Sequence, residues 1–347
     1  MHVIAAWRMH NQRLWGDPRA TPAEVVAGLA AMQAQEFAVA RWSVAQRCTG
    51  VTAAAMDAAY DAGEILRTHL LRPTWHFALP ADLRWLLALT APRVHALNAY
   101  YYRRTELDDA VFARTNALLA GVLAGGNHLT RQELAAFLAG EGIVAAGLRM
   151  GYILMRAELD AVICSGARRG RQHTYALFDE RVPPGPPVDR DAALAELTRR
   201  YFTSRGPATV KDFARWSSLT VAECRAGLEM VGSALVDETL DGRIYRYAPG
   251  SRGTPPPSPR VDLVQCYDEV VMSYSESRDV LGGEADGTPT LPHAILLDGQ
   301  LVGYWRPAGK TVEATVRRTL AAPAHRALRD AVYRYAAFVG TPVDLVG

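Results

Sequence analysis

Apolar and polar positions along residues 188–250 follow first the spacing of helices and then the spacing of strands. The stretches DRDAALAELTRRYFTSRG and PATVKDFARWSSLTVAECRAGLEMV predict three short helices. ALVDETLDGRIYRYAP then predicts a two-stranded hairpin that turns at Asp241-Gly242. Three helices followed by a hairpin are the layout of a winged helix, a variant of the helix-turn-helix.

The same order of elements is predicted for residues 111–182. ARTNALLAGVLA is helical, and LTRQELAAFLAGEGI begins with a capping box formed by Thr130 and Glu133. RMGYILMRAELDAVICSG predicts a third helix that runs into a strand, and ARRGRQHTYALFDERV predicts a turn and a returning strand.

A third set of these elements is predicted within residues 1–110. Thr21 is expected to cap a helix, with Pro22 in its first position and Glu24 completing a capping box. Two further helices are predicted around AVARWSVAQR and VTAAAMDAAYDAG. EILRTHLLRPTWHFAL then predicts two short extended pieces, broken at Arg72-Pro73.

Two proline-rich stretches, RVPPGPPVDR and RGTPPPSPR, mark the predicted boundaries, because neither suits a helix or a central strand. The tail beyond them is predicted to be rich in strands, with a hairpin turn at Asp298-Gly299 and an amphipathic helix at APAHRALRDAVYRYAAFVG. The expected fold is mainly α with β-wings: tandem winged-helix (helix-turn-helix) modules at 1–110, 111–182 and 188–250, and a C-terminal β-rich α+β module at 260–347.

Composition narrows the class of protein only a little. A net charge of +2 over 347 residues neither indicates nor excludes nucleic acid. Lys occurs only at 211 and 310, so Arg supplies the other basic side chains; selection for phosphate contacts and a GC-rich genome would both produce this bias. The four cysteines lie far apart without metal-site spacing, and no segment resembles a signal peptide or a membrane span. We therefore expect a cytoplasmic monomer without metal, cofactor or membrane contact.

The stretch AMQAQEF places Gln33 and Gln35 at the end of an apolar helix. The buried face of that helix is predicted by the spacing of Val25, Val26, Leu29 and Met32. Residues two apart point about 200° from one another on a helix, so the two glutamines share one side only where the chain is extended. An amide does not titrate, but it both accepts and donates hydrogen bonds. The alternative is a helix terminus whose amides satisfy orphan carbonyls.

Five blocks of the sequence resemble a known family. LAAMQAQEFAVARWSVAQR, GEILRTHLLRPTWHFALPADLRWLLALTAPR, RGPATVKDFARWSSL, YDEVVMSY and DGQLVGYWR are similar, in order, to blocks of the AlkZ/YcaQ family of winged-helix DNA glycosylases. The family's AlkZ branch has a Gln–aliphatic–Gln motif, whereas the YcaQ branch has Asp at the second polar position. Gln33 and Gln35 place this chain nearer the AlkZ branch.

The resemblance implies a function and a site. The expected activity is that of a monofunctional DNA glycosylase, which hydrolyses the N-glycosidic bond of N-alkylated, cationic purines of the N7 type. Bulky adducts and interstrand crosslinks are included, in DNA repair or in self-resistance to natural-product alkylators. The expected partner is duplex DNA containing alkylated purines, and the expected catalytic residues are Gln33 and Gln35, which would position the attacking water.

Two further blocks are candidates for contact with DNA or the lesion. In RTHLLRPTWH, the candidates are Arg67, Arg72, Thr74 and His76, as a wall of the lesion pocket; a buried strand with a satisfied core histidine is the alternative. In SGARRGRQHTY, the candidates are Arg168, Arg169 and Arg171 at the tip of a wing, which suits phosphate or minor-groove contact; a solvated turn is the alternative.

The last block, YDEVV, contains Asp268 and Glu269, for which we favour a structural role over that of a general base because no partner spacing is evident. Trp216, in FARWSSL, is expected in the core of the last winged helix. Two other functions remain open at this stage. One is a non-catalytic winged-helix DNA-binding protein, a regulator or lesion sequestrant, since fold alone does not decide function. The other is an unrelated hydrolase that uses the Asp268 region.

Overall fold

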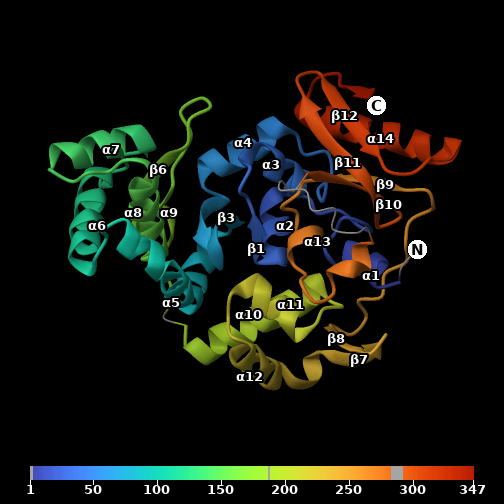
Figure 1. Ribbon diagram of the computed structural model, residues 1–347, viewed down its shortest axis with the longest axis horizontal. Helices are drawn as coiled ribbons and strands as arrows, with labels where there is room; N and C mark the ends of the chain where they lie inside the picture. The colour runs from blue at the N-terminus through green and yellow to red at the C-terminus, as the bar shows by residue number, and fades with distance from the viewer. Residues whose placement is uncertain (1–2, 187, 283–291) are drawn as a thin grey trace. The chain divides into compact units, whose positions relative to one another are not determined.

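The computed structural model describes residues 3–186, 188–282 and 292–347, and it combines helices with small sheets in an α+β fold (Figure 1). The chain forms two compact units. The first consists of Met1–Asp57, Ala195–Trp216 and Thr220–Gly347, and the second of Ala58–Leu194 with Ser217–Leu219. These units are defined by spatial contacts, whereas the four predicted modules follow the order of elements along the chain and stay a prediction.

The three predicted helices and two extended pieces of the N-terminal third appear in the predicted order, and the helix α1 (Val3–Asn11), which was not predicted, precedes them. After α1 the elements are α2 (Pro22–Leu29), β1 (Ala31–Gln33), α3 (Phe37–Ala45), α4 (Ala53–Ala62), β2 (Leu66–Leu70) and β3 (Arg72–Ala78). The side chain of Thr21 caps α2 as predicted, but Glu24 bonds the N–H of Ala20 and so does not close a capping box. The antiparallel strands β2 and β3 are separated at Leu71, one residue before the predicted break, because its backbone is left-handed at φ 61°.

The middle of the chain repeats this order after the long helix α5 (Pro80–Arg104). The elements are α6 (Asp109–Leu123), β4 (Leu129–Thr130), α7 (Arg131–Gly140), α8 (Gly147–Leu159), β5 (Ile163–Ser165), β6 (Thr174–Leu177) and α9 (Phe178–Arg181). The three strands form an antiparallel sheet in the order β4-β6-β5. Leu119, Leu134 and Ile153, from the three helices, are fully buried in one core, and the predicted capping box of Thr130 and Glu133 is confirmed.

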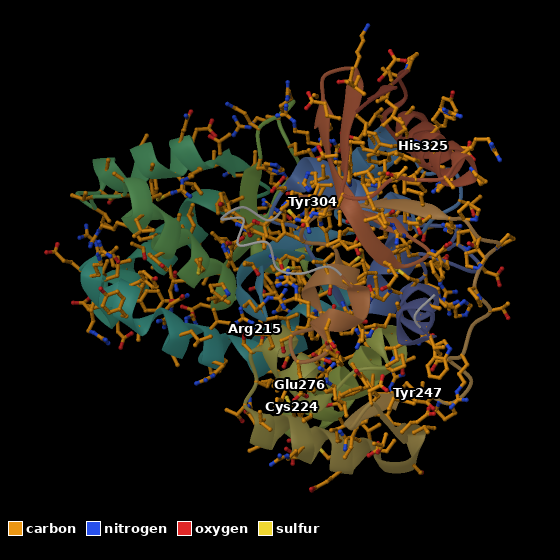
Figure 2. All side chains as sticks on the ribbon, turned by 45° about the vertical axis from the view of Figure 1, so that its right-hand side comes forward. Arg215, Cys224, Tyr247, Glu276, Tyr304 and His325 are labelled. Atoms are coloured by element: carbon orange, nitrogen blue, oxygen red, sulfur yellow. The ribbon has the colours of Figure 1, made fainter. Side chains whose placement is uncertain are left out.

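The third set consists of α10 (Arg190–Arg205), α11 (Val210–Ser217), α12 (Val221–Val231), the 3-10 turn η1 (Gly232–Ala234), β7 (Val236–Leu240) and β8 (Arg243–Tyr247). Figure 2 labels Arg215 on α11, Cys224 on α12 and Tyr247 on β8. The predicted hairpin is confirmed, since Asp241 and Gly242 both have the positive φ that its tight turn requires. Ala208, between α10 and α11, forms a β-bridge with Arg246 of β8.

The tail forms a five-stranded sheet on which the last helix packs (Figure 1). Its elements are β9 (Val261–Val264), α13 (Glu269–Met272), η2 (Arg278–Leu281), β10 (His293–Leu297), β11 (Gln300–Ala308), β12 (Thr311–Val316), α14 (Ala322–Val339) and β13 (Asp344–Val346). The hairpin turn at Asp298-Gly299 is confirmed. RVDLVQCYDEVVMSY belongs to the tail that was predicted to be rich in strands; it contains β9, but Asp268 then caps the short helix α13. No helix in the described part of the chain is long and apolar enough to cross a membrane.

Candidate active site

The two glutamines lie on the connection between α2 and α3. The helix ends at Leu29, earlier than the predicted end near Met32, because Ala30 leaves helical geometry with φ 59°. The chain is then extended through β1, which ends at Gln33, whereas Gln35 lies in a bend, so the extension expected between the two glutamines is seen only up to the first. Gln33 is 3% exposed and Gln35 is half-buried. The residues predicted to form the buried face of the helix, Val25, Val26, Leu29 and Met32, are all buried.

Next to this segment lies a fully buried ion pair between Arg205, the last residue of α10, and Glu269, the first residue of α13. Arg205 Nη2 and Nε approach Glu269 Oε2 at 2.8 and 3.1 Å, and neither side chain is exposed. Two charges in this position lose their hydration, so the pair persists only where further hydrogen bonds use the remaining donors and acceptors. Three of those further bonds go to the backbone between Leu29 and Gln33.

Arg205 and Glu269 together bond three alternate residues of that backbone. Arg205 Nη1 donates to the carbonyl of Leu29 at 2.8 Å, and Nη2 donates to the carbonyl of Ala31 at 2.7 Å. Glu269 Oε1 accepts the N–H of Gln33 at 2.8 Å. The chain between the helix end and the first glutamine is thereby fixed by charge-assisted hydrogen bonds from two distant residues.

Other buried groups complete the coordination of Glu269. Its Oε2 also accepts from the indole N–H of Trp216 at 2.9 Å and from Ser273 Oγ at 2.8 Å. The guanidinium of Arg205 lies 4.3 Å from the ring centroid of Trp216. Trp216 is therefore in the core, as expected, but it also holds the carboxylate in place. Gln265 adds a longer contact, 3.4 Å from its side-chain N–H to the carbonyl of Gln33.

The neighbouring carboxylate, Asp268, belongs to a second buried ion pair. Arg47 Nη2 and Nη1 bond its two oxygens at 2.7 and 3.0 Å, and both side chains are fully buried. Arg47 uses its other donors on the carbonyls of Gln12 and Ser43. Both carboxylates of YDEVV are thus occupied by arginines, which favours the structural interpretation over that of a general base.

Glu36, the residue after Gln35, lies near two ionisable groups, His293 and Cys266. Glu36 Oε2 lies 3.9 Å from His293 Nε2, and His293 Nδ1 accepts the backbone N–H of Cys266 at 3.2 Å. Burial lowers the pKa of His293, although Glu36 raises it in part. Burial raises the pKa of the Cys266 thiol to about 12, so it remains protonated near neutral pH.

The predicted lesion-pocket block forms β2, Leu71 and β3 in the second unit. Arg72 Nη2 lies 3.3 Å from His76 Nε2, and His76 Nδ1 lies 2.9 Å from the carbonyl of Thr74. Since a guanidinium only donates, Nε2 accepts and Nδ1 carries the proton of a neutral ring. Arg67 is buried with its guanidinium 4.3 Å from the Trp75 ring centroid, and burial lowers its pKa. A role in lesion contact stays a prediction for all four residues.

The predicted arginine tip is a tight turn between β5 and β6, with Gly170 at φ 61°. The three arginines differ in their surroundings. Arg168 is 13% exposed and bonds both carboxylate oxygens of Asp61, at 3.0 and 2.8 Å. Arg169 is half-exposed and pairs with Glu133, whereas Arg171 is exposed. Their contact with DNA stays a prediction.

Sequence reasoning found the two glutamines but missed Arg205 and Gln265. Gln33 and Gln35 belong to the first unit, together with Arg205, Gln265 and Glu269; the other predicted site residues belong to the second unit. Arg205 ends an ordinary amphipathic helix, so its pairing with a residue 64 positions away had no local signal. The described residues contain no cluster of His, Cys, Asp or Glu that could hold a metal ion.

The fold resembles that of a known enzyme. The structure superposes on the DNA glycosylase AlkZ of Streptomyces sahachiroi with a TM-score of 0.80, at 24% identity and covering 99% of both chains, a likeness that shows the fold. A curated protein of the same species, "Interstrand DNA cross-link repair glycosylase", is 25% identical over 324 residues, which are 87% of this chain and 86% of that protein.

The class of protein follows from these comparisons: it is an enzyme that acts on the N-glycosyl bonds of DNA. The profile of the family described as "DNA glycosylase AlkZ-like" matches residues 26–338, and the chain belongs to this AlkZ-like DNA glycosylase family. Membership confirms the family resemblance seen in the sequence and sets aside an unrelated hydrolase.

Proposed function

We propose that this glycosylase is monofunctional and hydrolyses the N-glycosidic bond of cationic, N7-type alkylated purines, with bulky adducts and interstrand crosslinks among its substrates. The observation that supports this most is the Gln-Ala-Gln segment, whose first glutamine is 3% exposed and ends a strand that a buried ion pair bonds. The name of the curated relative, a crosslink repair glycosylase, supports the extension to crosslinks. A role in DNA repair or self-resistance follows from such substrates.

The leaving group explains why amides would suffice. Alkylation at N7 gives the purine a positive charge, so it departs without a strong general acid. Sugar-cation character develops in the transition state, and a placed water must then attack. The carboxylates Asp268 and Glu269 are bound to arginines, so the proposal assigns them no proton transfer.

Gln33 and Gln35 would act by orientation and electrostatics. An amide oxygen can accept a hydrogen bond from the water while the amide nitrogen donates to a phosphate or sugar oxygen. Such positioning contributes a few kcal/mol at most, about what one preorganised group supplies elsewhere. An enzyme of this kind would release activated bases and leave normal bases in place.

DNA engagement is proposed to use winged-helix modules and to involve one protein molecule. The order helix, strand, helix, helix, strand, strand occurs in α2–β3 and in α6–β6, which supports the winged-helix interpretation. Among the arginines of the tip, Arg171 is exposed and Arg169 is half-exposed, so these two are best placed for phosphate. Replacing both with Ala should make the slope of log affinity against log salt shallower by up to about 0.9 per lost contact. An unchanged slope would place the phosphate contacts elsewhere.

The decisive experiment is incubation with duplex DNA containing one N7-methylguanine, followed by scoring of abasic sites under single-turnover conditions. The wild-type protein should generate abasic sites, and Gln35→Ala should generate them far more slowly while binding the same duplex. The same comparison on a crosslinked duplex tests the substrate range. Duplex binding without any abasic product, on N7-alkylated and crosslinked DNA alike, would support the non-catalytic alternative instead.

A further inference from the structure

We propose that Arg205 and Glu269 are positioning residues of the reaction, which set the backbone from which Gln33 and Gln35 act. The proposal rests on the function proposed above. Both residues belong to α-helix ends in the same compact unit as the motif. They bond the backbone that leads into the motif, up to the N–H of Gln33, so their effect on chemistry is exerted through the glutamines.

The contacts of the buried pair fall on every second residue of the chain that leads to the motif. The carbonyls of Leu29 and Ala31 bond Arg205, and the N–H of Gln33 bonds Glu269, at distances between 2.7 and 2.8 Å. Successive contacts two residues apart fix one edge of an extended chain. The segment that precedes the motif is therefore held at every second residue up to the first glutamine.

The helix start that follows the motif lacks a local side-chain cap. Glu36 occupies the N-cap position of α3, but its side chain makes no capping bond. Ala30, at the preceding helix end, has a positive φ that favours glycine. The start of α3 is thus without a side-chain cap, and the buried pair adds a restraint from distant positions in the sequence.

The two oxygens of Glu269 accept hydrogen bonds from different groups. Oε2 accepts from Arg205, Trp216 and Ser273, whereas Oε1 accepts the N–H of Gln33. Both oxygens of the carboxylate accept hydrogen bonds, whereas the glutamine that replaces it has one accepting oxygen and one donating NH₂. In Glu269→Gln, an oxygen kept toward the several donors leaves the NH₂ against the N–H of Gln33, which breaks the contact to the motif.

Asp268, the residue before Glu269, offers a matched control. Asp268→Asn removes the charge from an equally buried ion pair, that of Arg47 and Asp268, and it disturbs a carboxylate that accepts on both oxygens. Arg47 bonds the carbonyls of Gln12 and Ser43, outside the motif segment. Arg205→Lys is the second test variant: it keeps the charge beside Glu269 but lacks the fork that reaches two carbonyls.

The experiment compares Glu269→Gln, Arg205→Lys and Asp268→Asn at a temperature where circular dichroism shows each variant folded. We expect the single-turnover release of N7-methylguanine at saturating enzyme to fall about 10-fold or more in the first two variants and to stay within about 3-fold in Asp268→Asn. Amide hydrogen exchange in peptides covering residues 31–37 should be faster in the first two variants than in the control.

The exchange measurement does not require activity, so it separates this proposal from the proposed function. A wild-type protein that releases no N7-methylguanine would refute the function, and faster exchange confined to the two test variants would still support the positioning role. Equal exchange over residues 31–37 in test and control variants would overturn it. So would a release rate in Arg205→Lys and Glu269→Gln that matches the control. If Glu269→Gln does not fold, Arg205→Lys decides the question by the same two measurements.

Discussion

Two connections in this molecule lie at the same place in the order of elements but are held in opposite ways. The residues before α7 are fixed locally: Thr130 Oγ1 accepts the N–H of Glu133, and Glu133 accepts the N–H of Thr130. The residues before α3 have no such cap, and Arg205 and Glu269 bond their backbone from distant positions in the sequence. Arg205 and Glu269 bond the backbone of the connection before α3, whereas the capping box before α7 uses the side chains of Thr130 and Glu133.

The connection before α11 supports the same distinction. Thr209 and Asp212 bond each other's backbone N–H reciprocally, so this connection is also fixed by its own sequence. Of these three helix starts, only the one that follows the Gln-Ala-Gln segment lacks a local side-chain cap. The four predictions below test this contrast, beginning with the largest effect.

Arg205→Met should cost about 3–5 kcal/mol of folding stability, because it leaves the buried Glu269 carboxylate without its ion-pair partner. Urea unfolding followed by fluorescence measures the loss. Arg169→Met, which removes the exposed partner of Glu133 beside the capping box, should cost far less. Similar losses in both variants would remove the contrast between buried and local restraint.

Gln35→Ala should slow base excision by about 30-fold or more, roughly 2 kcal/mol of transition-state stabilisation, with the fold retained. Gln33→Ala should slow excision to a similar or lesser degree, and because Gln33 is buried it should also lower the melting temperature. Single-turnover assays with saturating enzyme measure both rates. Near wild-type excision in the double variant would remove the glutamines from the mechanism.

Thr130→Ala should cost about 1 kcal/mol of stability through loss of the helix cap. The excision rate at saturating enzyme should not change, since this connection carries no proposed catalytic group. Thermal unfolding and the single-turnover assay together check the prediction. A slower excision step without a change in stability would mean that the α7 region takes part in the chemistry.

The local cap should also respond to acid. The hydrogen bond from Arg169, with further bonds from Thr130, lowers the pKa of Glu133 from 4.5 to about 2. A carboxyl whose pKa is lower in the folded state stabilises it fully above pH 4.5, and that contribution disappears as the pH falls through about 2. Carboxyl carbon chemical shifts in an NMR titration measure the folded pKa. A midpoint near 4.5 would show that Arg169 does not hold the carboxylate in solution.

The contrast also explains what could be predicted from the sequence. The capping box at Thr130 and the hairpin turns at Asp241-Gly242 and Asp298-Gly299 were predicted correctly, because a few adjacent residues determine each of them. The order of helices and strands was predictable for the same reason, since each follows from its own apolar spacing. The capping box at Glu24 was wrong, because it depended on which neighbouring N–H the carboxylate would bond. The strand-rich prediction for RVDLVQCYDEVVMSY was right for β9 and wrong where Asp268 caps α13.

The candidate site could be predicted only in part. Gln33 and Gln35 were found through the resemblance to a family, and the extension of the chain after α2 was expected from geometry, although the strand ends at Gln33. The buried pair beneath them was not predictable: the arginine looks like any basic residue at a helix end, and the carboxylate looks like a member of an acidic pair. Their meeting depends on tertiary contacts across 64 residues, which no local pattern encodes.

The distance in sequence between the motif and its anchor also has a consequence for biosynthesis. Gln33 is made 236 residues before Glu269, which accepts its N–H. At roughly 5–20 residues per second, a ribosome needs roughly 10 to 50 seconds to cover that interval. During this time the growing polypeptide carries its glutamines without the contact that fixes them. The contact between Gln33 and Glu269 can therefore form only after most of the polypeptide has been synthesised.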